Sequence, residues 1–470
     1  MREHGLEPQF PPDAVAEANG RSGAPTRAEE PVRDLRRLAW CSIDNDDSRD
    51  LDQLSVAESL PGGRVRVLVA IADVDAAVPR QSAVDRHAAL NTTSVYTPAK
   101  MYPMLPERLS TDLTSLGPDV DRLAVVVDIV VSPGGEVEHA EVYGAQVRNQ
   151  AKLAYSAVGP WLAGEGNAPH PAGAGNGFDA QLRLQYDVAE RLDRVRQEHG
   201  ALKFESTELA PRFDGDALVG LQADSPNPAK LLIENLMIAA NAATARFLSE
   251  RRLPSIRRVV RQPKRWDRIV ELARRTGASL PDTPDLPALA AFLAARKAAA
   301  PATFAELSLA VVKLIGSGEY TVDAPGDEAP GHFALAIRAY THSTAPNRRY
   351  PDLVTQRLIK AALAGHPVPY SVEELGQIAA HCTRQEDVAN AVERQVRKSA
   401  AALVMAAHVG EQFDAVVAGA SDKGVFVKLV SPPVEGKVVR GERGLDVGDH
   451  VRVRLQGVDV ERGFIDFATA

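Results

Sequence analysis

The segment RVRVLVAI, residues 64–71, alternates polar and apolar residues and then becomes continuously apolar, which predicts a strand that enters a buried sheet. RLAVVVDIVV, residues 122–131, is rich in β-branched residues and is followed by turn-forming residues, so it predicts a second strand. A sheet is therefore expected early in the chain.

Farther along the chain, the hydrophobic spacing becomes helical. It predicts helices over 181–199 and 227–248, and a third from Ser371, which has capping-box spacing with Glu374, to about Val409. Strands first and helices later indicate an α+β fold.

The last sixty residues change character again, because short apolar runs alternate with Gly, Pro and Asp. This pattern predicts five strands and a small barrel of the OB type over 410–470. RNA binding there would depend on exposed side chains such as Phe426, Lys428, Arg452 and Arg454, and a purely structural barrel is the alternative.

Composition indicates an ordinary globular protein. The 470 residues carry a formal net charge of −8, which excludes a histone-like protein that coats nucleic acid by bulk attraction. Two cysteines, Cys41 and Cys382, form no disulfide framework, and neither the first residues nor any apolar run fits a secretion signal or a bilayer span. A cytoplasmic protein without membrane contact is expected.

The N-terminal region holds two short helical patterns, PPDAVAEA at 11–18 and RAEEPVRDLRR at 27–37, separated by a turn sequence. Residues 1–36 are therefore expected to form a helical extension. The Gly- and Ala-rich stretch 161–179 lacks a phosphate-binding motif and predicts a mobile surface loop.

The segment CSIDNDDSRDLDQL, residues 41–54, places five aspartates within nine residues. A divalent cation is the usual way to neutralise such a cluster at a functional site, and oxygen ligands favour Mg or Mn over zinc. A calcium EF-hand is excluded because Arg49 and Ser55 stand where glycine and glutamate are required. A solvated acidic loop remains the alternative.

The segment YTHSTAPNRRYPDLVTQRLIKAAL, residues 340–363, places two arginines before a helix. Pro351 and Asp352 suit the first helical turn, so Arg348 and Arg349 lie at a helix N-terminus, which favours an anion. Surface salt bridges are the alternative role for both arginines.

A third stretch, residues 251–268, carries eight Lys and Arg against one acid, Asp267. It predicts either a channel that follows a nucleic-acid backbone or a charged junction between a helix and a loop.

The two motif segments resemble signatures of the ribonuclease II family, also called the RNB family, of processive 3′-to-5′ exoribonucleases. SIDNDDSRDLDQL is similar to TID-x5-DLDDA, and STAPNRRYPDLVTQRL is similar to TSPIRRYPDL-x3-RL. The resemblance is colinear over about residues 30–365. It implies an RNB-type catalytic domain, a mixed sheet packed with helices, over 37–409, and an OB-fold RNA-binding domain over 410–470. The family's two cold-shock barrels are expected to be missing upstream.

The resemblance also implies the residues of a catalytic site. Asp44, Asp50 and Asp52 match three of four catalytic aspartates, whereas the fourth falls on Gln53. Mg is the implied cofactor, with Mn as a substitute, and Gln53 puts the second of two ions in doubt. Arg348 matches the arginine that stabilises charge on the scissile phosphate.

Further residues match positions that contact RNA in the family. Tyr155 matches a tyrosine that positions the 3′-terminal nucleotide and is implied to take part in catalysis. The remaining implied RNA contacts are two aromatic residues that clamp the base stack, an acid with its neighbouring amide, and an arginine: Tyr96, Phe204, Glu234 or Asn235, and Arg258. A structural role in the core or on a solvated face is the alternative for each.

The implied function is processive, Mg-dependent hydrolysis of RNA to nucleoside 5′-monophosphates by a monomer. Single-stranded RNA is the expected substrate, and the missing barrels would let RNA with duplex regions approach the site. A catalytically weak or inactive RNA-binding protein of the same family is one alternative, because Gln53 replaces an aspartate. A metal-dependent endonuclease is another.

Overall fold

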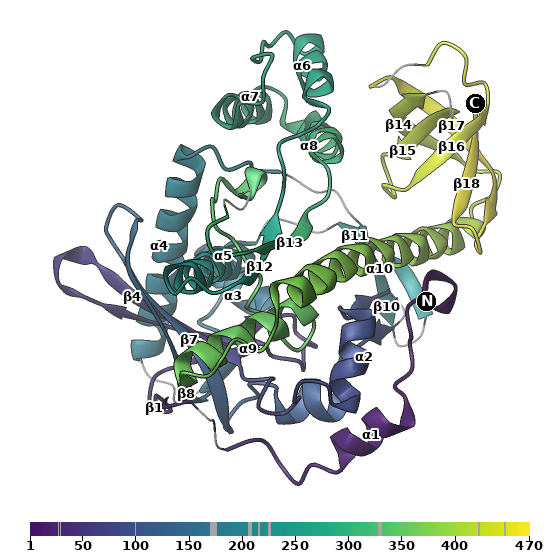
Figure 1. The fold of residues 1–470 in the computed structure, drawn as a ribbon. Helices are drawn as coiled ribbons and strands as arrows, with labels where there is room; N and C mark the ends of the chain where they lie inside the picture. The colour runs from purple at the N-terminus through teal and green to yellow at the C-terminus, as the bar shows by residue number, and fades with distance from the viewer. Residues whose placement is uncertain are drawn as a thin grey trace.

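A computed structural model describes residues 1–470 apart from 27, 29, 99, 170–175, 205–208, 215–216, 224–226, 328–330, 422–423 and 446–447. It shows an α+β body built on a large mixed sheet, and a closed five-stranded barrel at the C-terminal end (Figure 1). The predicted α+β class with a terminal barrel is therefore confirmed.

The large sheet has the order β1-β8-β7-β4-β3-β2-β9. Its strands are β1 (Val32–Asp34), β2 (Cys41–Asp44), β3 (Gln53–Ser59), β4 (Val65–Ala72), β7 (Asp121–Val131), β8 (Val137–Arg148) and β9 (Ala151–Ala154). Neighbours pair antiparallel except at the two edges, where β1 runs parallel to β8 and β9 parallel to β2. β4 and β7 confirm the two predicted strands. They are central in the sheet and mostly buried, which explains their continuous apolar runs.

Helices cover the sheet and connect it to the barrel (Figure 1). They are α1 (Pro12–Asn19), α2 (Ala83–Asn91), α3 (Tyr155–Leu162), α4 (Asn176–Glu198), α5 (Pro228–Glu250), α6 (Trp266–Arg275), α7 (Leu286–Ala299), α8 (Pro301–Ile315), α9 (Tyr350–Ala364) and α10 (Val372–Ala406). α4, α5 and α10 confirm the predicted helices. The capping box of Ser371 and Glu374 is present, and α10 ends at Ala406 rather than near Val409.

Shorter elements complete the body. Three two-stranded sheets pair β5 (Val95–Tyr96) with β6 (Met101–Tyr102), β10 (Leu209–Asp214) with β11 (Ala217–Ala223), and β12 (Ser255–Val259) with β13 (Glu319–Asp323). Short helical turns are η1 (Arg2–His4), η2 (Pro61–Gly63), η3 (Arg108–Leu113) and η4 (Phe333–Leu335). Helices α6, α7 and α8 lie in the chain between β12 and β13, and they share a hydrophobic core separate from that of the sheet.

α5 is the one helix of the described residues that is long and apolar enough to cross a membrane by length and composition. Its apolar window is 72% buried inside the fold, against α3, α4 and the sheet. Burial on most sides explains the apolar composition of α5 as that of a core helix.

The N-terminal region only partly follows the prediction. α1 matches the first helical pattern, but the helix expected over 27–37 is wrong, because residues 32–34 form β1. Val32 pairs with Gly144 at the edge of the large sheet, so strand pairing outweighs the local helical preference. Of the loop predicted over 161–179, residues 170–175 lie outside the described part of the chain, and helices α3 and α4 occupy both ends.

The barrel closes in the order β14-β15-β16-β18-β17. Its strands are β14 (Gln412–Ser421), β15 (Gly424–Leu429), β16 (Glu435–Arg440), β17 (His450–Asp459) and β18 (Phe464–Thr469), so the five predicted strands are confirmed. The barrel has its own core, which extends onto the last turns of α10. Gln395 and Ser399 of α10 donate to the carbonyl of Glu461 and help to attach the barrel.

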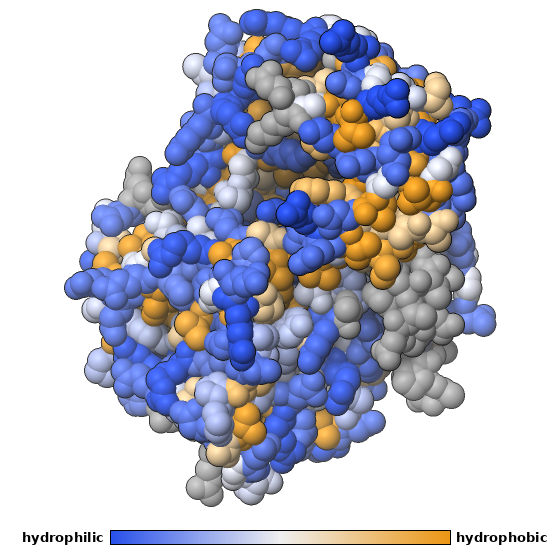
Figure 2. Space-filling view, turned by 90° about the vertical axis from the view of Figure 1, so that its right-hand side faces the viewer, coloured by the Kyte–Doolittle hydropathy of each residue, from blue (hydrophilic) through white to orange (hydrophobic). Residues whose placement is uncertain are grey.

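Apolar side chains are also exposed on and near the barrel. Figure 2 views the molecule from the right-hand side of Figure 1 and shows hydrophobic residues gathered in the upper part of that face. The exposed large apolar residues of the barrel and of the adjoining end of α10 are Leu403, Val409, Val430, Val439 and Phe464.

A buried ion-pair cluster joins α9 to the residues after β4. The Nζ atom of Lys360 lies 2.8 Å from Asp73, 3.3 Å from Asp75 and 3.9 Å from Glu30. Replacing Lys360 with Met leaves these carboxylates without their shared cation, and we expect a loss of about 3–5 kcal/mol of unfolding free energy. Urea unfolding of Lys360→Met measures it, with the exposed Lys264→Met as control. Equal stability of the two variants would contradict the expectation.

Candidate active site

The segment with two arginines, residues 343–349, is called the arginine loop below. It leads into α9, and Arg349 is the N-cap residue of that helix, so the predicted position at a helix N-terminus is confirmed. Arg349 lies 2.7 Å from Asp352, which also accepts a hydrogen bond from the N–H of Ala345. Arg349 therefore has the structural ion-pair role, whereas the side chain of Arg348 faces Asp52 of the other motif.

The acidic loop, residues 44–52, connects β2 to β3. Asp44 ends β2, and its Oδ1 accepts hydrogen bonds from the Ser48 hydroxyl at 3.0 Å and the Asn45 N–H at 2.7 Å. The Asp46 carboxylate accepts from the Ser156 hydroxyl at 2.6 Å. These contacts fold the loop back on itself and anchor it against α3.

Asp52 and Arg348 meet at the centre of the site, although 295 residues separate Asp52 from Asn347, the neighbour of this arginine. Asp52 is 2% exposed, and its Oδ1 accepts a hydrogen bond from the Asn347 N–H at 2.9 Å. Its Oδ2 lies 3.4 Å from Nε of Arg348 and has no hydrogen-bond partner among the described residues. The fold therefore brings the two motif segments into contact.

The electrostatics of the site follow from burial. Removal from water raises the pKa of Asp52 to about 7, and the positive charge of Arg348 only partly opposes this rise. Burial likewise raises the pKa of Asp50; the charge of Asp44 adds to the rise and Arg348 opposes it. A buried carboxylate with a free oxygen is costly by itself, so the arrangement favours a bound cation.

This burial predicts how stability depends on pH without metal. The pKa of Asp52 is about 7 in the fold against an ordinary 3.8, so the folded state binds the proton first as pH falls. The contribution of Asp52 to unfolding free energy should therefore rise as pH falls from about 7 to about 4, by up to roughly 4 kcal/mol. Urea unfolding in EDTA at several pH values, for wild type and Asp52→Asn, measures it. Parallel pH profiles of the two proteins would contradict the expectation.

Two predicted aromatic residues flank the carboxylates. Tyr96 in β5 is 43% exposed; partial burial raises the pKa of its phenol, Arg348 opposes the rise, and the negative charge of Asp50 adds to it. Burial of the phenol raises the pKa of Tyr155, the first residue of α3, and the charge of Asp44 adds to that rise. Both tyrosines therefore lie at the site where the carboxylates and Arg348 converge.

The other predicted RNA contacts have different surroundings. Phe204 packs against the core of α6, α7 and α8, and Glu234 is exposed on α5. Its neighbour Asn235 is buried, accepts a hydrogen bond from Arg196 at 2.6 Å and donates to a backbone carbonyl. Arg258 binds Glu386 of α10 through two hydrogen bonds and lies over the ring of Tyr320. The structure does not bring these residues to the Asp52 carboxylate.

Part of the basic stretch 251–268 is paired with acids, and only some of these pairs are buried. Arg257 lies 2.6 Å from Asp323, Arg261 pairs with Glu319, and Arg268 lies 3.4 Å from Glu271. For the buried Arg257 and for Arg258, these pairs favour the structural interpretation over a phosphate-binding channel.

Sequence reasoning missed two features of the site. The N–H of Asn347 holds Asp52, and a backbone donor leaves no signal in residue types. Beneath Arg349 lies a buried pair in which the Tyr320 hydroxyl and Nδ1 of His342 are 2.8 Å apart. Burial lowers the pKa of His342 well below its ordinary value, so this ring stays neutral. His342 belongs to the quoted motif, but only the fold reveals its partner.

The site fits a magnesium ion by its donor set. Among the described residues, no three His, Cys, Asp or Glu side chains are grouped closely enough to hold a metal. Mg²⁺ commonly takes only one or two carboxylates and completes its shell with water and substrate phosphate oxygens. The unpartnered Oδ2 of Asp52 and the neighbouring Asp50 supply such oxygens.

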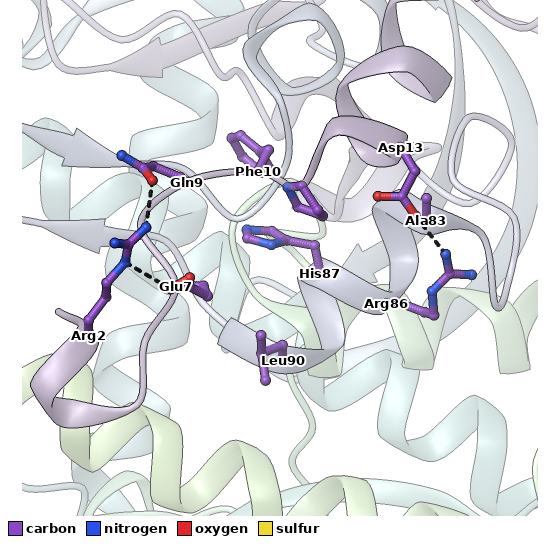
Figure 3. Close-up of a pocket in the computed structure, with 10 residues that line it drawn as sticks. Arg2, Glu7, Gln9, Phe10, Asp13, Ala83, Arg86, His87 and Leu90 are labelled. Carbon is purple, nitrogen blue, oxygen red and sulfur yellow. Dashed lines mark hydrogen bonds and ion pairs between the residues drawn. The ribbon is translucent and has the colours of Figure 1, made fainter.

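A cavity of about 450 Å³ lies elsewhere, between the N-terminal segment and α2 (Figure 3). Arg2 at its edge donates to Glu7 and Gln9, and Arg86 pairs with Asp13. Because its lining charges are paired and none belongs to either motif, it is not the candidate active site.

Comparison with known proteins agrees with this geometry. Residues 32–365 match the RNB domain, and residues 411–470 match the RNase II-type exonuclease C-terminal S1 domain. Ribonuclease R of Escherichia coli K12 is 32% identical over 100% of this chain, which spans 61% of the length of that relative.

Solved structures share the fold. Mycoplasma genitalium RNase R in complex with ribose methylated single-stranded RNA has a TM-score of 0.91 at 22% identity, covering 100% of this chain and 77% of that one. The same protein in complex with double-stranded RNA has a TM-score of 0.89 at 23% identity, covering 100% and 82%. Yeast Ssd1, a pseudonuclease, has a TM-score of 0.70 at 17% identity, covering 88% and 51%.

Proposed function

Because the chain belongs to the RNB family, we propose that it is a processive 3′-to-5′ exoribonuclease that releases nucleoside 5′-monophosphates. The observation that carries this proposal is the approach of Arg348 to the buried Asp52 at 3.4 Å. Contact between the two motifs, across most of the chain, supports the proposal because the carboxylate would bind a cation and the guanidinium would bind a phosphate.

Magnesium is the proposed cofactor, with manganese as a substitute, since nucleases of this family depend on divalent metals. Asp52 and Asp50 would supply its protein oxygens. The acidic loop would have to close around the ion for Asp44 and the neutral Gln53 to join them, since no three acidic side chains of the described residues are grouped closely enough to hold a metal. A bound metal would activate water and neutralise phosphate charge. Arg348 would donate to a non-bridging phosphate oxygen, where the N-terminus of α9 also favours negative charge.

RNA is the proposed substrate class. Tyr155 and Tyr96 would hold the terminal nucleotides, because they flank the carboxylates and offer aromatic faces for stacking. Phe204, Glu234 and Arg258 would contact the strand farther from the scissile bond. Single-stranded RNA is the main proposed form. RNA with duplex regions is included because Mycoplasma genitalium RNase R has solved structures in complex with single-stranded and with double-stranded RNA.

The proposal also covers the organisation of the protein. We propose an N-terminal extension over 1–36, a catalytic domain over 37–409 and an RNA-binding barrel over 410–470. The S1 match and the separate barrel core support the last boundary, whereas the RNB match from residue 32 and the pairing of β1 in the large sheet favour a slightly earlier start of the catalytic domain. A cytoplasmic monomer remains part of the proposal.

Gln53 offers a direct test of the metal site. It begins β3 next to Asp52 and brings no charge. Adding a carboxylate in Gln53→Asp should tighten Mn²⁺ binding on the order of tenfold, since affinity for hard cations rises with ligand charge. Calorimetric titration of both metal-free proteins with Mn²⁺ measures it. Unchanged affinity would show that this position does not face the ion.

Product analysis tests the activity. RNA labelled at its 3′ end and incubated with the protein and Mg²⁺ should release labelled nucleoside 5′-monophosphate, and EDTA should stop the release. Internal fragments would indicate the endonuclease alternative. Binding without products would indicate an inactive RNA-binding protein, an alternative kept because the fold also occurs in a pseudonuclease.

A further inference from the structure

Asp52 is contacted by two consecutive residues of the arginine loop. The N–H of Asn347 donates to Oδ1 at 2.9 Å, and Nε of Arg348 lies 3.4 Å from Oδ2. The placement of this short stretch therefore sets how the guanidinium faces the carboxylate.

The rest of the arginine loop is held through its backbone and its flanks. Asn241 accepts from both the N–H and the hydroxyl of Ser343 at 2.9 Å. The Ser94 N–H donates to the carbonyl of Arg348 at 3.0 Å. These contacts fix the course of the loop, but none of them reaches the acidic loop.

The Asn347 side chain makes a different contact. It is 1% exposed, and its Oδ1 accepts from the Thr114 hydroxyl at 2.6 Å, while its Nδ2 has no partner among the described residues. The Thr114 hydroxyl has one hydrogen to donate, and two acceptors lie in reach: Oδ1 of Asn347 and the carbonyl of Leu109. The Leu109 carbonyl already accepts the Thr114 N–H at 3.0 Å, so we assign the hydroxyl hydrogen to Asn347. A half-satisfied buried amide costs stability, so packing alone does not explain it.

The residues that follow Thr114 hold the acidic loop. The Ser115 hydroxyl donates to the carbonyl of Arg49 at 2.7 Å and accepts from the N–H of Leu51 at 3.1 Å. The Leu116 N–H donates to the carbonyl of Leu51 at 2.9 Å. The turn of residues 114–116 therefore contacts the arginine loop through Thr114 and the acidic loop through Ser115 and Leu116. Because Asp52 of the acidic loop also binds the arginine loop, these contacts form a closed ring.

We propose that Thr114 and Asn347 are positioning residues, whose hydrogen bond joins the two loops and fixes Arg348 opposite Asp52. This inference rests on the proposed function, because it assigns the pair to the same reaction. Neither side chain needs to touch RNA. Their effect is to keep the guanidinium and the carboxylate at a fixed separation.

Kinetics of matched variants test the inference. Thr114→Val and Asn347→Leu remove the hydrogen bond with little change in size, and each should lower kcat about 10- to 100-fold, since small misplacements at a reacting centre have effects of this order. KM should change by less than about threefold because no RNA-contacting group is lost. The double variant should be no worse than the single ones, because both remove one contact.

Two controls separate positioning from general destabilisation. Thr341 is equally buried and donates to the Ile256 carbonyl at 2.6 Å, so Thr341→Val removes one buried hydrogen bond without touching either loop contact. Its kcat should stay within about twofold of wild type. Thr114→Ser should restore most of the kcat lost in Thr114→Val. Unchanged kcat in Asn347→Leu, or additive losses in the double variant, would overturn the proposal.

A crystal structure of Asn347→Leu tests the geometry independently of activity. The separation of Nε of Arg348 and Oδ2 of Asp52 should increase from 3.4 Å. An unchanged separation would reject the positioning role even if wild type cleaves no RNA. Absence of products from wild type would instead contradict the proposed function.

Discussion

Replacing Asp52 with Asn should lower kcat by about 10²- to 10⁴-fold, because metal-assisted stabilisation of charge in the transition state is worth several kcal/mol. The substitution keeps the size and the buried position of the side chain but removes the negative charge beside Arg348. Single-turnover hydrolysis of end-labelled RNA in saturating Mg²⁺ measures the effect.

The matched control for Asp52→Asn is Asp46→Asn in the same loop. Asp46 is exposed, and its carboxylate accepts from Ser156 at 2.6 Å, an interaction that an amide oxygen can keep. We expect Asp46→Asn to retain activity within about threefold. Equal losses in the two variants would show that the acidic loop acts as a diffuse charge and not through Asp52.

Replacing Arg348 with Ala should lower kcat by about 10²- to 10³-fold, the range found when one preorganised donor to a developing charge is removed. Lys at this position should recover only part of the activity, because an ammonium lacks the planar fork of donors. Stability should change little, since the side chain is 43% exposed and its ion pair with Asp52 is long.

Arg349 is the adjacent control and should behave in the opposite way. It pairs at 2.7 Å with Asp352, whose carboxylate is fully buried. Arg349→Ala leaves that carboxylate without its partner, so a loss of about 3 kcal/mol of unfolding free energy is expected. Urea unfolding and kinetics of both variants are compared. A stable, inactive Arg349→Ala beside a stable, active Arg348→Ala would reverse the assignment of the two arginines.

Elements with strong local signals were predictable from the sequence. The apolar runs of β4 and β7 and the capping residues of α10 predicted those elements to within a few residues. β1 was not predictable, because its three exposed residues form a strand only by pairing with β8 and so become the edge of the large sheet. The secondary-structure propensity of a segment determines its conformation only where no neighbouring sheet edge can form hydrogen bonds with its backbone.

The candidate site divides in the same way. Asp52, Arg348 and Tyr96 were found from motif resemblance, and the fold brings them together. Asn347 was not found, because its contribution to Asp52 is a backbone N–H. The ion pair between Arg258 and Glu386 joins residues 128 positions apart, so no sequence spacing reveals it. Contacts through the backbone and between remote segments need the three-dimensional structure.

The most direct test of the account uses one RNA strand labelled at its 3′ end, with wild type, Asp52→Asn and Arg348→Ala compared side by side in Mg²⁺ and in EDTA. The account predicts labelled nucleoside 5′-monophosphate from wild type in Mg²⁺, and losses in the two variants of the sizes given above. Mononucleotide release at the wild-type rate from Asp52→Asn would contradict the claim that this carboxylate and Arg348 form the hydrolytic site.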